Sequence, residues 1–375
     1  MATSPETMIQ QPTRDRPWPD SAESPVHSYN EWDPLEEIIV GVISGAAVPE
    51  WDIAVASTMP RQSEELFRSR VGGGFPDEHV RLAEEELNRF AAVLTEAGIR
   101  VVRPAPINHR RPFATPNWCS PGGVYSAMPR DLLLIVGDTI IEAPMAWRAR
   151  YFEIDAYRPL LTDYFRRGAR WIAAPRPQLL DQWYDPDYDR EHPQVSGRYL
   201  TLEHEPTFDA ADFVRCGHDI FVQRSHVTNR LGIEWVARHL GNDYQVHEID
   251  VVDPAPMHID ASFMPLAPGK LLLNPQRVVS APAMFESWQV RWAPKPTLPQ
   301  DHVLYMSSAW VSMNVLMLDE TRVVVEASET PLIDLLKDWG LEIVPVQFRN
   351  VMRFGGCFHC VTADIYRRGE LRSYF

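Results

Sequence analysis

The stretch that decides the fold is DLLLIVGDTIIEAP (residues 131–144), followed closely by AYRPLLTDYFRRGARWIAAP (residues 156–175). The first segment predicts two short apolar strands joined by the polar turn Gly137-Asp138. The second predicts a helix that ends at Gly168, a residue suited to a left-handed C-cap, and then a third strand. Two strands, a helix and a strand therefore form one structural unit.

The same order of elements recurs along the chain. Further segments that predict a helix, a glycine stop and an apolar strand are residues 84–106 with Gly98, 229–250 with Gly241, and 330–347 with Gly340. Other apolar strands are LEEIIVGV (residues 35–42), DIFVQ (219–223), GKLLLNP (269–275) and RVVVEAS (322–328). GKLLLNP has no comparably clear helix of its own. These strands make about five β-rich units of a size that packs against its neighbours.

Alternating strands and helices form a doubly wound sheet by default. Here many units carry two or more strands for each helix, which favours strands closing around a pseudo-symmetric centre with the functional site at its mouth. No stretch marks a clear boundary between two domains, because YDPDYDREHPQVSG (residues 184–197) is typical of a long surface loop.

The composition argues against several classes of function. With 51 acidic and 36 basic residues the net charge is -15, which would repel nucleic-acid phosphate and anionic membranes. No apolar run approaches the ~20 residues that span a bilayer. Residues 1–25 are rich in proline, serine and charge and lack a signal-peptide core, so we expect a disordered tail. The few scattered cysteines indicate a reducing compartment, and we expect a cytoplasmic protein.

The segment GGCFHC (residues 355–360) has several interpretations. A zinc site would need a second pair of ligands, and a redox dithiol would open a helix, whereas VTADIY predicts a strand. On such a strand His359 would point away from Cys360. A Gly-Gly turn could instead deliver a single nucleophile close to a substrate. From this stretch alone, two buried and inert cysteines are the favoured interpretation.

Three other stretches carry polar residues within apolar surroundings. PMHID (residues 256–260) would set His258 and Asp260 on one face of a strand. Asp209 follows apolar residues that would bury it, although the start of a surface helix explains it equally well. Asp131 stands just before an apolar run and could simply mark the start of a strand. Each of these residues, taken alone, has an ordinary structural explanation.

Taken together, these stretches resemble the amidinotransferase family, most closely its glycine amidinotransferase branch. The resemblance covers nearly everything from residue 26 to 375 and is carried by AMPRDLLLIVGDTIIEAPMAWRAR, EPTFDAADFVRCGHDIFVQRSHVTNRLGIEWVARHL, PMHIDASF, LLLNPQR, MSSAWVSMNVLMLDE and GGCFHCVTADIYRRGELRSYF. It implies a single domain over residues 26–375. The implied fold is an α/β, five-bladed, pseudo-fivefold propeller of ββαβ modules, as in guanidine-modifying enzymes, with a central active site. It also suggests a homodimer.

The resemblance assigns a role to each candidate residue. Cys360 is the implied nucleophile, His258 the general acid/base and Asp209 the carboxylate that orients it. The implied contacts with the substrate are Asp131 and Asp260 for the guanidinium group, and Arg277, Ser307 and Ser308 for the amino-acid end. Met257 matches the members that use glycine, which favours a small amino-acid acceptor. One position departs from the family pattern, because Cys357 stands where a third glycine is usual.

The implied reaction moves the amidino group of L-arginine through a covalent intermediate on Cys360 to an amine. Glycine as acceptor would give guanidinoacetate and L-ornithine, with ping-pong kinetics and without a metal or organic cofactor. We expect His258, as an imidazolium, to lower the pKa of the cysteine thiol. The alternatives are lysine or an aminated secondary-metabolite intermediate as acceptor, an arginine deiminase-like hydrolase, an inactive binder of arginine-like ligands, and a cysteine protease. The expected partners are small molecules only.

Overall fold

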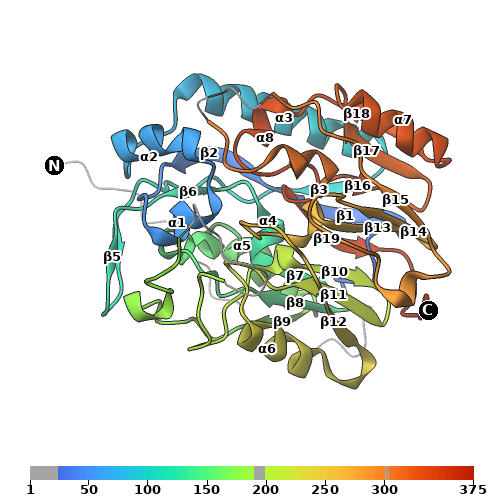
Figure 1. Ribbon diagram of the computed structural model, residues 1–375, viewed down its shortest axis with the longest axis horizontal. Coiled ribbons are helices and arrows are strands. Elements are labelled where there is room, and N and C mark those ends of the chain that lie inside the picture. Colours follow the sequence, from blue (N-terminus) through green and yellow to red (C-terminus); the bar gives the residue numbers. More distant parts are fainter. Residues whose placement is uncertain (1–23, 190–198, 300–301, 303) are drawn as a thin grey trace.

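Repeated three-stranded sheets form the framework of the protein in a computed structural model, which describes residues 24–189, 199–299, 302 and 304–375 (Figure 1). Within these ranges there are five such sheets and two two-stranded ones. The predicted tail at residues 1–25 lies outside the described residues except at its last two positions. Much of the loop predicted at residues 184–197 lies outside them as well.

All five three-stranded sheets have one topology. The first strand runs antiparallel to the second, and the third runs parallel to the second. The sheets are β19 (Thr362–Arg367), β1 (Leu35–Val40) and β3 (Arg100–Val102); β7 (Leu133–Val136), β8 (Thr139–Glu142) and β9 (Arg170–Ala173); β10 (Phe213–Cys216), β11 (Asp219–Gln223) and β12 (Gln245–Ile249); β13 (Phe263–Ala267), β14 (Lys270–Leu273) and β15 (Gln289–Trp292); β16 (Leu316–Met317), β17 (Arg322–Glu326) and β18 (Glu342–Val346). The last strand of the chain thus completes the sheet that the first strand begins.

A helix connects the second and third strands in four of the five sheets. These helices are α3 (Asp77–Glu96), α5 (Arg158–Arg166), α6 (Arg230–Leu240) and α7 (Thr330–Asp338). The sheet of β13–β15 has only the short 3₁₀ helix Ala283–Phe285 at this place, as its sequence predicts. In Figure 1 the long helices α3, α6 and α7 lie at the periphery and the strands lie between them. Each of the four units with a helix therefore buries one apolar helix stripe against its own sheet.

The predicted glycine stops are confirmed. Gly98, Gly168, Gly241 and Gly340 all have positive φ angles, between 74° and 108°. A Cβ atom added at any of them would meet nothing within 4 Å. These glycines are therefore needed for the left-handed backbone that ends each helix and not for space.

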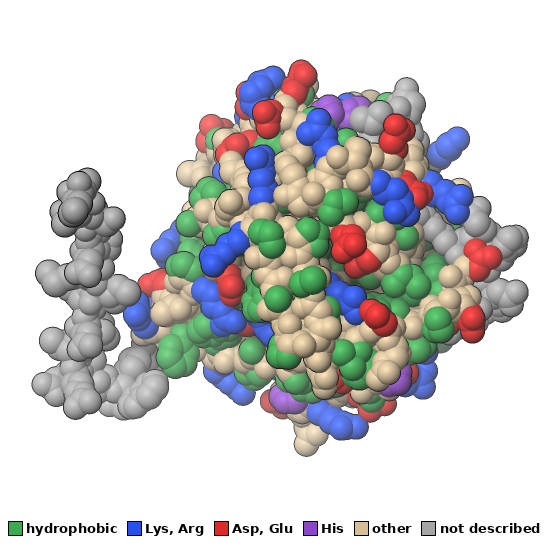
Figure 2. All heavy atoms as spheres, turned by 90° about the vertical axis from the view of Figure 1, so that its left-hand side faces the viewer, with side chains coloured by type: hydrophobic (Ala, Val, Ile, Leu, Met, Phe, Trp, Pro, Cys, Tyr) green, Lys and Arg blue, Asp and Glu red, His purple; other side chains and the backbone are tan. Residues whose placement is uncertain are grey.

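The remaining elements lie outside the five units or within their connections. They are β2 (Val42–Ala47) paired with β6 (Val124–Ser126), β4 (Phe113–Ala114) paired with β5 (Cys119–Ser120), and the helices α1 (Ile53–Thr58), α2 (Glu64–Arg70), α4 (Pro129–Leu132) and α8 (Arg349–Met352). No helix among the described residues is long and apolar enough to cross a membrane. On the face shown in Figure 2, acidic and basic side chains are interspersed with small hydrophobic areas, and no basic patch gathers there.

A turn or short helix precedes the first strand of every three-stranded sheet. These segments hold Asp131 before β7, Asp209 before β10, His258 and Asp260 before β13, Ser307, Ser308 and Asn314 before β16, and Cys360 before β19. All the catalytic residues predicted from the sequence thus occupy the same position in successive units. Equivalent ends of the five sheets therefore supply the candidate site.

Candidate active site

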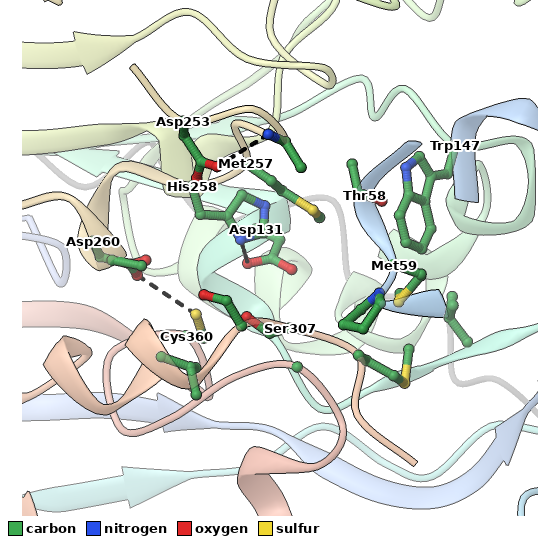
Figure 3. Close-up of a pocket in the computed structure, with 18 of the residues that line it drawn as sticks. Thr58, Met59, Asp131, Trp147, Asp253, Met257, His258, Asp260, Ser307 and Cys360 are labelled. Atoms are coloured by element: carbon green, nitrogen blue, oxygen red, sulfur yellow. Dashed lines mark hydrogen bonds and ion pairs between the residues drawn. The ribbon is translucent and has the colours of Figure 1, made fainter. Parts of the chain in front are cut away.

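A cavity of about 480 Å³ lies where these segments meet (Figure 3). The predicted residues that line it are Asp131, Met257, His258, Asp260, Arg277, Ser307, Ser308 and Cys360. In Figure 3 His258, Asp131, Asp260 and Cys360 converge on one side, and Trp147, Thr58 and Met59 close the other. Asp209 lies behind the lining and reaches the site through His258. The structure thus brings every predicted site residue together.

His258 is held between two carboxylates. Its Nε2 is 3.1 Å from Asp209 Oδ2, and its Nδ1 is 3.7 Å from Asp131 Oδ1. Burial alone would lower the pKa of His258, but Asp131 and Asp209 outweigh it and raise the pKa to about 10. The ring is therefore an imidazolium at neutral pH, which suits a general acid.

The prediction that PMHID (residues 256–260) forms a strand is wrong. His258 has a left-handed backbone with φ of 59°, and the 3₁₀ helix Ile259–Ala261 begins directly after it. The strand β13 starts only at Phe263. A positive φ at a residue with a side chain is strained, and such strain is concentrated at functional sites. The turn aims the ring of His258 into the cavity, which regular strand alternation would not specify.

Arg150 is a member of the site that the sequence did not predict. It ends the 3₁₀ helix Arg148–Arg150 and lines the cavity. Its Nη1 lies 2.9 Å from Asp131 Oδ2 and 3.5 Å from Asp209 Oδ2, and its Nε donates to Glu153 Oε2 at 2.6 Å. A buried guanidinium thus compensates carboxylates that would otherwise repel each other. No spacing in MAWRAR distinguishes it from Arg148, which is partly exposed.

The turn that carries the nucleophile is fixed by Asn314, another residue that the sequence did not predict. Asn314 Oδ1 accepts hydrogen bonds from the backbone N–H groups of Cys357, at 3.2 Å, and Cys360, at 2.9 Å. A Cβ atom on Gly356 would lie 2.4 Å from Met128 Sδ and 2.7 Å from Cys360 Cβ. Glycine therefore allows the close approach of Met128 and Cys360 at this turn.

The structure corrects the expected effect of His258 on the thiol. Burial, followed by the nearby carboxylates of Asp260 and Asp131, raises the pKa of Cys360 well above its usual value. Cys360 Sγ donates to Asp260 Oδ2 at 3.5 Å. Without a ligand the thiol is therefore protonated, because burial and the field of the two carboxylates both disfavour the thiolate. A cation placed between the carboxylates would reverse this effect.

His359 does not point away from the site, as a strand would require. It lies in the turn before β19, where its Nδ1 is 2.8 Å from Asp260 Oδ2. This is the carboxylate oxygen that the thiol of Cys360 also contacts. The prediction was wrong because residues 359 and 360 are not extended.

Cys357 occupies the apolar core instead of the cavity wall. Its side chain is fully buried, and its backbone lacks the positive φ that would demand glycine. The departure from the family pattern is therefore compatible with the turn. All four cysteines are free thiols in this structure.

The lining of the cavity also includes a cation. Arg277 Nε lies 2.8 Å from Asp253 Oδ2, and its Nη2 donates to Ser308 Oγ at 2.8 Å. Asp253 was not predicted from the sequence. The pair of anchors holds the guanidinium of Arg277 in one orientation, as needed to bind a carboxylate by two parallel hydrogen bonds.

Reactive atoms of three side chains lie together in this cavity. One carboxylate oxygen of Asp131, one ring nitrogen of His258 and Cys360 Sγ are all within 4.8 Å of one another. Such a set could also ligate a metal ion, but His258 and Cys360 would each have to lose a proton first. Both residues are protonated in this site, so His258 is suited to act as an acid and Cys360 as a nucleophile that must first lose its proton.

Comparison with known proteins gives the family. An L-arginine:L-lysine amidinotransferase of Pseudomonas savastanoi pv. phaseolicola is 51% identical over 351 residues, covering 94% of this chain and 97% of that protein. The chain belongs to the amidinotransferase family. The mitochondrial glycine amidinotransferase of Danio rerio is 48% identical, covering 96% of this chain and 87% of its own.

Solved structures confirm the α/β fold of this family. The amidinotransferase of the saxitoxin biosynthetic pathway from Microseira wollei has a TM-score of 0.87 and 47% identity, over 94% of this chain and all of its own. No protein-family model matches the chain. Because its sequence is about half identical to those of amidinotransferases over nearly its whole length, the protein is an amidino-group transferase.

Proposed function

We propose that the protein transfers the amidino group of L-arginine through a covalent intermediate on Cys360 to glycine, giving guanidinoacetate and L-ornithine. The observation that carries this proposal is the convergence of Asp131, His258 and Cys360 within 4.8 Å in one cavity. An acid, a thiol and a carboxylate that line one cavity are the groups that an attack on a planar cation requires.

The donor would bind through charges at both ends. Its guanidinium group would lie between Asp131 and Asp260, whose carboxylates form charge-assisted hydrogen bonds with a planar cation. Its α-carboxylate would meet Arg277 and the hydroxyl groups of Ser307 and Ser308. The bound guanidinium places a positive charge beside the thiol, which lowers the thiol pKa when the substrate is in place.

In the first half-reaction the sulfur of Cys360 attacks the guanidinium carbon of arginine. The new S–C bond forms as the bond from that carbon to the side-chain nitrogen of ornithine breaks. His258 gives its proton to the departing nitrogen and takes up the thiol proton. Ornithine leaves as a neutral amine, and the positive charge stays on the amidino group of Cys360.

The second half-reaction reverses these steps with another amine. The acceptor nitrogen forms a bond to the amidino carbon as the C–S bond breaks, and His258 passes one amine proton to sulfur. Because both amines use the same place next to His258, the acceptor enters only after ornithine has left. Ping-pong kinetics follow from this order.

Glycine is the proposed acceptor because Met257, shared with glycine-using members, lines the cavity next to His258. Lysine is the second candidate, since the relative from Pseudomonas savastanoi is an L-arginine:L-lysine amidinotransferase. Lysine resembles ornithine with one more methylene group, so its carboxylate could use the same Arg277 anchor.

A protease is disfavoured by the groups around the sulfur. Acyl transfer needs N–H donors for an oxyanion, but the N–H of Cys360 already donates to Asn314 Oδ1 at 2.9 Å. The carboxylates of Asp131 and Asp260 would also repel an oxyanion. The same carboxylates would stabilise a cationic intermediate.

We also propose that residues 26–375 form one domain whose five sheets are the blades of a pseudo-fivefold propeller. The support is that each sheet supplies the segment before its first strand to the site. A homodimer and a cytoplasmic location stay predictions. Light scattering of the purified protein measures the first, and fractionation of the source cells the second.

Product analysis tests the proposed reaction. The protein is incubated with isotopically labelled arginine alone, with glycine, and with lysine, and the label is followed by chromatography. Labelled guanidinoacetate and an equal amount of ornithine are expected with glycine. Labelled homoarginine instead would make lysine the acceptor. Citrulline without an acceptor would show a hydrolase and contradict the proposal.

A further inference from the structure

His359 is buried next to the nucleophile, yet it does not line the cavity. Its two ring nitrogens face two different carboxylates. Nδ1 is 2.8 Å from Asp260 Oδ2, and Nε2 is 3.2 Å from Glu31 Oε2. A neutral imidazole has one N–H group and one lone pair, so it could satisfy only one of these oxygens. With both carboxylates ionised, this geometry requires the doubly protonated ring.

Glu31, on the far side of His359, is itself firmly held. Arg215 donates to both of its oxygens, from Nε at 2.8 Å and from Nη2 at 2.6 Å. Arg130 Nη1 lies 3.6 Å from Glu31 Oε2, and both arginines also contact Asp364, at 2.6 Å and 2.8 Å. All five of these side chains are buried. Glu31 is thus an ionised anchor within a rigid charge network.

The same network also binds the backbone of the turn that contains His359 and Cys360. The side-chain Nε of Arg130 donates to the carbonyl of His359 at 3.2 Å, and its backbone N–H donates to the carbonyl of Cys360 at 3.3 Å. Arg130 also directly precedes Asp131 in α4. The ring of His359 is therefore fixed from both its backbone and its Nε2 side.

We propose that His359 is a positioning residue for the donor: clamped between Glu31 and Asp260, its imidazolium holds the Asp260 carboxylate ionised and oriented for the guanidinium group. This inference rests on the proposed function, in which Asp260 binds arginine. The hydrogen bond from His359 holds Oδ2 in place beside the thiol of Cys360. Asp260 therefore contributes a complete negative charge to a dry site where protonation would otherwise be favoured.

The sequence position of His359 gives this arrangement a second consequence. His359 and Cys360 are neighbours in one turn, so the group that orients the carboxylate and the group that attacks the substrate move as one body. The position of the sulfur relative to the Asp260 carboxylate is therefore fixed by this one turn.

Two variants separate the charge of His359 from its hydrogen bond. His359→Asn places an amide Nδ2 near the position of Nδ1, so it keeps a donor to Asp260 but loses the charge and the contact with Glu31. His359→Leu removes both. The matched control is His247→Asn, because His247 on β12 makes a comparable 2.7 Å contact with Asp219 and does not line the cavity.

The first measurement is steady-state kinetics of arginine with each variant. We expect KM for arginine to rise roughly 100-fold in His359→Leu and roughly tenfold in His359→Asn, with smaller changes in kcat. His247→Asn should leave both constants unchanged. Thermal unfolding shows whether each variant is folded, and the partial rescue by asparagine distinguishes positioning from a general loss of packing.

The second measurement is independent of chemistry. Equilibrium dialysis of labelled arginine against Cys360→Ala, with and without His359→Asn, should show a roughly tenfold weaker Kd in the double variant. If wild-type protein forms no amidino adduct, the proposed function fails, while this binding comparison still judges His359. Folded His359→Asn and His359→Leu with an unchanged Kd and KM for arginine would overturn the inference.

Discussion

Asp131 and Asp260 are two carboxylates of the same kind that line one cavity, but their environments differ. Both are buried, and both stand just before the first strand of their sheets. Burial raises the pKa of Asp131 despite His258 and Arg150. Burial would also raise the pKa of Asp260, but the hydrogen bond and the charge of His359, together with His258 and Asn314, outweigh burial and lower that pKa. One carboxylate is already stabilised as an anion, and the other is not.

Their partners explain the difference. Arg150 contacts Asp131 and Asp209 together, so its positive charge is shared. Among the described residues Asp131 Oδ1 accepts no hydrogen bond. Asp260 has the imidazolium of His359 at 2.8 Å. Under the proposed function, a cationic substrate would supply the missing partner of Asp131, whereas His359 already supplies that of Asp260.

The largest expected effect is that of removing the sulfur of Cys360, which lies near both carboxylates. Cys360→Ala should lose at least about 10⁴-fold in kcat, because no other group can carry the amidino intermediate. Arginine should still bind, since both carboxylates remain. The control Cys216→Ala removes a buried thiol from β10, outside the cavity, and should keep its activity. Turnover by Cys360→Ala at the wild-type rate would contradict the covalent route.

Replacing Asp131 or Asp260 by asparagine tests directly whether their environments differ. Asp131→Asn and Asp260→Asn should each lower kcat/KM for arginine by roughly 10²- to 10³-fold, because each removes a charge from the guanidinium site. Their effects on stability should differ in sign. Asp260→Asn breaks a favourable ion pair and should lower the free energy of unfolding by about 1–3 kcal/mol, whereas Asp131→Asn should leave it unchanged or raise it.

Chemical unfolding of the ligand-free variants at neutral pH measures this sign. Asp219→Asn, on β11 and outside the cavity, is the control for kinetics. Equal destabilisation by Asp131→Asn and Asp260→Asn would contradict the claimed difference, because the two carboxylates would then be equally stabilised in the free protein.

The imidazolium of His258 gives a pH-dependent effect of moderate size. Its pKa is about 10 in the folded protein and about 6.5 in an unfolded chain. The raised pKa stabilises the fold fully below the unfolded value, and this stabilisation is lost as pH rises toward about 10. Between these values the free energy of unfolding should fall by roughly 1.4 kcal/mol per pH unit more in wild type than in His258→Gln. Urea titrations at several pH values measure both slopes, and equal slopes would rule out a charged His258.

The smallest expected effect comes from restoring the glycine usual in the family. Cys357→Gly should leave kcat and KM within about twofold and lower the free energy of unfolding by about 1 kcal/mol, because it removes a buried side chain and frees the backbone. Steady-state assays and thermal unfolding measure these changes. A large loss of activity would show that Cys357 takes part in positioning Cys360.

Local patterns predicted the framework well. Gly168 and its counterparts ended helices because a left-handed stop depends only on neighbouring residues. The strand pair after Asp131 was also correct, since apolar and β-branched residues favour strands wherever they are buried. The resemblance to the family supplied the site residues, which the individual motifs left open.

The features that sequence reasoning missed depend on tertiary contacts. Arg150 and Asn314 reach the site only because distant units meet there, and no spacing in their own segments signals it. His359 was assigned to the wrong side because the chain turns before β19. The protonated state of Cys360 follows from carboxylates on two other units. Such electrostatic effects require the assembled cavity.

The most direct test of the account is the mass of the protein itself. Wild-type protein is mixed with arginine without an acceptor, quenched in acid, and measured intact and after digestion, with Cys360→Ala treated in parallel. The expected result is the mass gain of one amidino group, located on the peptide that contains Cys360 and discharged by adding glycine. An unmodified Cys360 during active turnover of arginine would contradict it.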